Sequence, residues 1–243
     1  SAASDVYKRQ AYGLGIVTKK YTIHMPLFKD LVDRDGLKRF FSVNVDIFLR
    51  TLCLVAVTMW FTRVGATQGT LILAVNTLLM QFFMLFSYFM DGFGFAGEAL
   101  VGRYVGAKDA AMAKLSIKML MKWGAVLALA FSLLYFVGGT EFLNLLSSNR
   151  EVTDEARDYF YWIVALPILS FSAFSWDGIY IGATDTRAML VSMAAATTVY
   201  FTAYYFLFPL LGNHGLWVAF LAYLSVRGII LALMRHRIYR LCR

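Results

Sequence analysis

Six apolar runs, each about as long as a helix that crosses a membrane, dominate this sequence of 243 residues. Such a helix needs about 20 predominantly apolar residues. Only 16% of the residues are charged, below the roughly 25% that is typical of soluble domains. We therefore expect an all-α fold, a polytopic transmembrane bundle of about six spanning helices. The runs lie at about residues 47–62, 70–101, 115–137, 159–181, 188–211 and 215–234.

Composition divides the chain into three segments. Residues 1–10 are polar and lack the apolar region of a signal peptide, so we expect a non-native or disordered leader. Residues 11–40 have the pattern of the end of a truncated helix followed by a cytoplasmic linker. Residues 41–243 are expected to form the six-helix transmembrane bundle. This pattern favours a truncated protein, and a half-sized protein that pairs with itself stays an alternative.

The net charge of +8 does not indicate a nucleic-acid partner, because the positions of the basic residues fit those of a membrane protein. They gather before the first run, between the second and third runs, and in the C-terminal tail, whereas the opposite connections are mostly acidic. The positive-inside rule then places both ends of the chain in the cytoplasm. We expect a multi-pass protein of the plasma membrane, the inner membrane of a bacterium. The basic residues of the three segments include Lys19, Lys20, Lys38, Arg103, Lys108, Lys114, Lys118, Lys122, Arg235, Arg237 and Arg240.

Three acidic residues lie inside apolar runs, where a carboxylate is costly. An aspartate at mid-membrane costs roughly 3 kcal/mol on insertion scales. Asp91 and Glu98 are seven residues apart, which turns a helix by roughly 700° and brings both carboxyl groups to nearly one face. Asp177 lies in a later run. We expect all three to line a shared aqueous cavity and to take part in the movement of a small solute or ion.

Other residues of the second run are candidates for the same cavity. Asn76 and Gln81 would supply hydrogen bonds, and Tyr88 and Phe89 would form part of an aromatic wall for lipophilic cations. Phe82, Phe83 and Phe86 could extend that wall. Packing against lipid or core is the alternative for each aromatic residue.

Three further charged residues have a structural interpretation. Asp46 and Arg50 are one helical turn apart, which predicts a local ion pair near the cytoplasmic interface. Arg227, in the last run, is expected to pair or to extend toward the cytoplasmic face.

Catalysis is not expected. Cys53 and Cys242 are far apart, and the three histidines lie in different connections, so we predict no metal site and no cofactor other than a coupling ion. A membrane-embedded transferase that handles diphosphates would need several acids within a turn or two to hold magnesium. A flippase for lipid-linked oligosaccharides would need a more basic cavity, and a purely structural subunit would not need the intramembrane acids. These remain the alternatives.

One segment resembles a known family. Residues 82–109, FFMLFSYFMDGFGFAGEALVGRYVGAKD, are similar to a motif of the multidrug and toxic compound extrusion (MATE) family, in the branch of the DNA-damage-inducible protein F. VNVDIFLRTLCL (43–54) and WDGIYIGATDTR (176–187) resemble the start of the family's seventh helix and the end of its tenth. The resemblance covers about residues 11–240.

The resemblance implies a twelve-helix transporter made of two six-helix halves, with this chain as the C-terminal half and the N-terminal half as its missing partner. It implies alternating access, a substrate site near the bilayer midplane, and export of organic cations or amphipathic compounds in exchange for H⁺ or Na⁺. Asp177 falls where sodium-coupled members have a cation-binding acid. Arg50 stands near the place of their second acid, so protons are the expected coupling ion.

Competition between a proton and an organic cation for one carboxylate would couple proton entry to substrate export. A bound organic cation favours the ionised group, whereas protonation discharges it. The key aspartate that many proton-coupled members carry on their first helix is not in this sequence, so we expect Asp91, Glu98 and Asp177 to do this in the present half.

Overall fold

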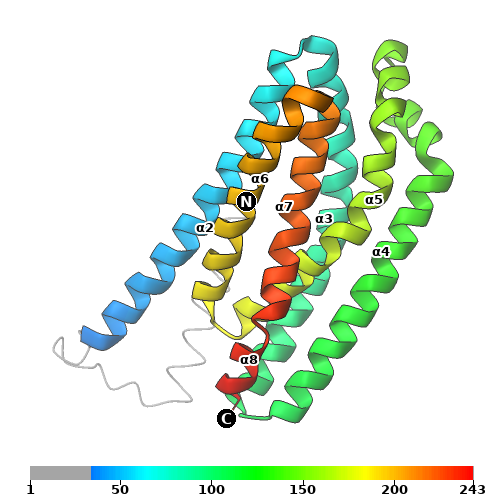
Figure 1. Cartoon of the computed structure of the whole chain (residues 1–243). Coiled ribbons are helices and arrows are strands. Elements are labelled where there is room, and N and C mark those ends of the chain that lie inside the picture. The colour runs from blue at the N-terminus through cyan, green and yellow to red at the C-terminus, as the bar shows by residue number, and fades with distance from the viewer. Residues whose placement is uncertain (1–33, 243) are drawn as a thin grey trace, which may run out of the picture. The chain divides into compact units, whose positions relative to one another are not determined.

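The computed structural model describes residues 34–242, and these are helical apart from short connections. The expected leader (1–10) and residues 11–33 of the expected truncated helix and linker (11–40) lie outside the described residues, and residues 34–40 begin a helix. Six helices among the described residues are long and apolar enough to cross a membrane, which confirms the predicted all-α bundle (Figure 1). The helices are α2 (Arg34–Thr67), α3 (Thr70–Gly106), α4 (Ala110–Leu146), α5 (Arg150–Gly182), α6 (Thr186–Leu211), α7 (Asn213–Leu233) and the short α8 (His236–Leu241).

Residues 43–243 form one compact unit, in which successive helices alternate in direction. The connections α3–α4 and α5–α6 lie with α8 at one end of this unit, and the connections α2–α3, α4–α5 and α6–α7 lie at the other (Figure 1). The first end carries most of the basic residues named above. We call it the basic end. The helices are longer than the apolar runs: 37 residues of α3 rise about 55 Å, more than the roughly 30 Å of hydrocarbon.

The two connections at the basic end have the same sequence pattern and the same backbone. Gly-Ala-Lys-Asp ends at Asp109, and Gly-Ala-Thr-Asp ends at Asp185. Lys108 and Thr184 both adopt a φ of 55°, in the left-handed region. The amides of the two aspartates donate to the carbonyl five residues earlier, at 2.9 and 3.2 Å. Their carboxylates cap the next helix by accepting from the amide three residues later, at 3.0 and 3.2 Å. Four residues therefore end one helix and start the next in both places.

Glycines bring α3 and α5 into backbone contact. A Cβ atom on Gly178 would lie 2.6 Å from the carbonyl carbon of Gly94, and one on Gly182 would lie 2.5 Å from the carbonyl oxygen of Glu98. Closer to the basic end, a Cβ on Gly102 would lie 3.2 Å from the carbonyl oxygen of Gly182. Only glycine permits this close crossing, as is common between membrane helices. The crossing holds Glu98 and the neighbour of Gly178, Asp177, at fixed positions.

α2 contacts the rest of its unit differently along its length. Toward its C-terminal end Val57, Phe61 and Val64 are buried, and the ring of Phe61 packs 5.1 Å from that of Trp217. Between residues 43 and 56, Asp46 is the one buried residue. Residues 43–56 of α2 are therefore held in the unit largely by the charged side chains of Asp46 and Arg50, whose partners are described in the next section.

Candidate functional site

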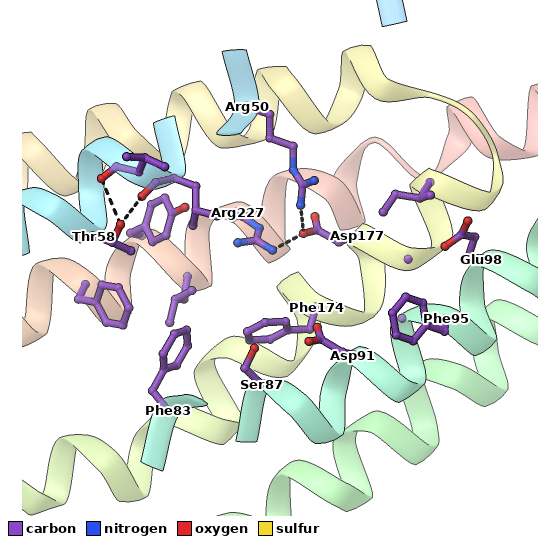
Figure 2. A pocket seen from close by; sticks show the side chains of 18 residues that line it. Arg50, Thr58, Phe83, Ser87, Asp91, Phe95, Glu98, Phe174, Asp177 and Arg227 are labelled. Carbon is purple, nitrogen blue, oxygen red and sulfur yellow. Dashed lines mark hydrogen bonds and ion pairs between the residues drawn. The ribbon is translucent and has the colours of Figure 1, made fainter. Parts of the chain in front are cut away.

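A cavity of about 440 Å³ lies between α2, α3, α5 and α7. Most of its wall is apolar or aromatic, and five charged side chains and the aliphatic hydroxyl groups of Ser87 and Thr58 interrupt that wall (Figure 2). The lining residues are Arg50, Leu54, Val55 and Thr58 of α2, Phe83, Ser87, Asp91, Gly94, Phe95 and Glu98 of α3, Phe174, Asp177, Gly178 and Ile181 of α5, and Phe220, Tyr223, Leu224 and Arg227 of α7.

The structure brings Asp91, Glu98 and Asp177 to this one cavity. Asp91 and Glu98 share a face of α3 because their spacing is close to two turns. Asp177 reaches the cavity from α5, beside the glycine crossing of α3 and α5. The placement matches the sequence-based expectation, whereas the roles of the three acids in transport stay predictions.

Asp177 is held by two arginines. The guanidinium group of Arg50 donates to its Oδ2 at 2.5 Å, and Arg227 donates to the same oxygen (Figure 2). The side chains of Arg227 and Asp177 are only 6% and 12% exposed. Two positive groups balance the charge of one carboxylate, and the carboxylate in turn makes the burial of Arg227 tolerable. Arg227 was expected to pair or to extend toward the basic end, and it pairs.

Asp91 and Glu98 are in a different situation. Neither makes a hydrogen bond or an ion pair to another of the residues 34–242, and both are exposed to the open side of the cavity. With every group ionised, three carboxylates face two guanidinium groups. The surplus negative charge lies on the α3 wall, where a cation or a proton can neutralise it.

The predicted ion pair between Asp46 and Arg50 is wrong. Asp46 accepts instead from Arg187 at 3.3 Å and from the hydroxyl of Thr186 at 3.3 Å, at the start of α6. Arg50 turns to Asp177. One helical turn allows two side chains to meet, but here each faces a different neighbouring helix. Asp46 binds groups at the start of α6, and Arg50 binds the buried Asp177 of α5. Both residues therefore join α2 to other helices.

Asn76 was predicted to line the cavity, and this is also wrong. It is buried on another face of α3, about 22 Å along the helix from Asp91. Its side-chain amide exchanges two hydrogen bonds with that of Asn213, at 2.8 and 2.9 Å. The indole of Trp217 donates to Asn76 Oδ1 at 2.9 Å. This network joins α3 to α7 and has a structural role.

Gln81, Tyr88 and Phe89 do not line the cavity either. Gln81 and Tyr88 lie at a separate groove of about 390 Å³ between α3 and α4, and the half-exposed Phe89 packs against Phe131 with 4.9 Å between ring centres. The aromatic wall comes from other residues, of which only Phe83 was among those named from the sequence. Spacing from Asp91 could have found one more, since Phe95 lies four positions after Asp91 on the same face of α3. The remaining wall residues are Phe95, Phe174, Phe220 and Tyr223.

The Asn76 network gives a stability prediction. Replacing Asn76 with leucine is expected to lower the free energy of unfolding by about 1–3 kcal/mol, because the buried donors of Asn213 and Trp217 would lose their acceptor. Asn144→Leu is the matched control, since Asn144 is exposed. Thermal unfolding of the protein in detergent compares the two. Equal losses would contradict the structural role of the network.

Comparisons with known proteins agree with this architecture. The MatE family model matches residues 45–206. DNA damage-inducible protein F of Escherichia coli is 35% identical over 207 residues, which cover 85% of this chain and 45% of that protein. Protein DETOXIFICATION 43 of Arabidopsis thaliana is 24% identical over 213 residues, which cover 88% of this chain and 40% of that protein. The chain thus spans less than half the length of these two relatives.

Solved structures have the same fold. A MATE transporter of Vibrio cholerae matches with a TM-score of 0.77 and 18% identity, over 95% of this chain and 53% of that one. A MATE structure in complex with MaL6 matches with a TM-score of 0.76 and 18% identity, over 93% of this chain and 52% of that one.

Proposed function

Because the chain belongs to the MatE family, and within it resembles DNA damage-inducible protein F, we propose that it forms one half of a membrane exporter. Its substrates are organic cations or other amphipathic compounds, and it exports them by alternating access in exchange for a cation. The observation that carries the proposal is the cavity in which two unpaired carboxylates stand beside aromatic side chains. Aromatic faces and carboxylates are the groups that bind lipophilic cations.

A second six-helix half completes this transporter. The relatives are about twice as long as this chain, and α2 leaves large apolar side chains exposed on the half of the helix that flanks the cavity. In the complete protein the N-terminal half covers this side, and the substrate site lies between the halves. The basic end faces the cytoplasm of a bacterial cell, by the positive-inside rule.

Protons are the coupling ion that fits the site better. Asp177, the acid that resembles the cation ligand of sodium-coupled relatives, is already neutralised by Arg50 and Arg227. Asp91 and Glu98 are free to bind either a proton or the positive group of a substrate. Since one carboxylate cannot hold both, binding of the one releases the other. The two arginines are likewise engaged, which disfavours a flippase that would need them for a diphosphate.

Neutral variants at the α3 acids test the proposal. In the full-length protein, reconstituted in vesicles with an imposed pH gradient, Asp91→Asn and Glu98→Gln are expected to reduce ethidium export. Asp91→Asn should have the larger effect, because Asp91 lies beside the Asp177 cluster, and we expect a loss of about tenfold or more, equivalent to about 1.4 kcal/mol.

Glu151→Gln is the control, because Glu151 is an exposed acid in the first turn of α5, at the end opposite the basic end. It should export at the unaltered rate. Full proton-driven export in the double variant of Asp91 and Glu98 would refute this assignment.

A further inference from the structure

A second groove, separate from the cavity, lies between α3 and α4 near the basic end. Its volume is about 480 Å³, and its wall includes Phe93, Leu100, Met119 and Trp123. Phe93 follows Asp91 by two residues, or roughly 200° around α3, so the groove opens on the opposite face of that helix. The groove therefore plays no direct part in the proposed export.

The groove is apolar and open on the outside of the unit. Leu100 is 39% exposed, Met119 47% and Trp123 57%. In a bilayer this surface meets lipid, and an acyl chain has the shape and the polarity to fill a slot between two helices. A tryptophan at such a place is typical of the headgroup region.

Basic residues surround the groove. Arg103, Lys118 and Lys122 each follow a groove residue by three positions, and residues so spaced are neighbours on a helix surface. All three are exposed, and none makes an ion pair to another residue of the described chain. The apolar groove at the other end, where Gln81 and Tyr88 lie, has no basic residue three positions beyond any of its wall residues.

We propose that this groove is a binding site for an anionic phospholipid of the leaflet at the basic end. One acyl chain lies between α3 and α4, and the phosphate lies among Arg103, Lys118 and Lys122. Basic pockets between membrane helices on the cytoplasmic side recognise anionic head groups in this way. The apolar slot alone would accept any lipid, so the three basic side chains provide the selectivity.

Trp123 serves as the reporter in the test. The full chain is reconstituted in phosphatidylcholine vesicles that contain either dibrominated phosphatidylglycerol or dibrominated phosphatidylcholine, since bromine on an acyl chain quenches a nearby indole. The Trp123 signal is the difference between the unaltered protein and Trp123→Phe. The anionic lipid is expected to quench Trp123 at lower mole fractions than the zwitterionic one, by about fivefold for each lysine that contributes.

Neutral variants of the lysines on α4 test whether the basic side chains beside the groove select the anionic lipid. Lys118→Gln with Lys122→Gln is expected to remove most of the preference for phosphatidylglycerol, because only Arg103 of the three basic side chains remains. Lys114→Gln removes one charge from the same helix, but the ammonium group of Lys114 lies 5.1 Å from the ring of Tyr239 in α8, away from the groove. This variant should keep the preference.

Three outcomes would overturn the proposal. They are equal quenching by the two lipids, no quenching of Trp123 by either lipid, and an equal loss of preference in the Lys114 variant and in the Lys118 and Lys122 variant. The last would show that total charge, and not the groove, attracts the lipid.

Discussion

Replacing Asp177 with alanine is expected to destabilise the helical unit by about 3–5 kcal/mol, because the buried guanidinium group of Arg227 would lose its counter-charge. Arg50 would lose its partner as well, and with it the contact of α2 with α5. Thermal or denaturant unfolding of the protein in detergent measures the loss. Few single substitutions in this chain should cost more.

Two comparisons make this prediction specific. Asp154→Ala breaks an exposed pair with Arg157 on the same helix and should cost at most about 1 kcal/mol. Asp177→Ala combined with Arg227→Met should regain much of the loss, because the uncompensated charge is gone. If Asp177→Ala were as mild as Asp154→Ala, the buried cluster would not hold these helices together.

Gly178→Ala is expected to cost about 1–3 kcal/mol or more, and to reduce export in the full-length protein. A methyl group there would press on the main chain of Gly94, which cannot rotate away as a side chain would. The helices α3 and α5 would have to separate, and the acids on the two sides of the crossing would move apart. Unfolding in detergent and the vesicle assay measure the two effects.

Gly94→Ala is the matched control, at the same crossing. A Cβ atom on Gly94 would approach only the carbonyl oxygen of Phe174, at 4.0 Å. Because alanine is also the better helix former, this variant should be neutral or slightly more stable, by up to about 1 kcal/mol. Equal effects of the two alanines would mean that close packing at Gly178 does not position the cavity.

The spans and the face shared by Asp91 and Glu98 could be predicted because they depend on the chain alone. The length of an apolar run and the helical period fix them, whatever the neighbouring helices are. The Gly-Ala-X-Asp connections belong to the same class, since left-handed backbone and capping are local properties, although their repetition was not recognised before the structure.

The partners of Asp46, Arg50 and Asn76 could not be predicted in this way. Spacing along one helix shows which side chains can meet within it, but not which neighbouring helix each one faces. Asn76 and Asn213 are 137 residues apart in the sequence. Two amides inside apolar surroundings are a signal that they bind each other, yet that signal does not distinguish mutual pairing from exposure to a cavity.

The narrow attachment of α2 has a consequence for biogenesis. From residue 43 to residue 56 this helix buries only Asp46 in its own unit, and two ion pairs, Asp46–Arg187 and Arg50–Asp177, join it to α6 and α5. After insertion, this stretch of α2 would remain loosely held while α3 to α7 pack, and in the proposed transporter it would gain further neighbours when the second half docks. Quality-control proteases that survey unassembled membrane proteins would then recognise an unpaired half at α2 first.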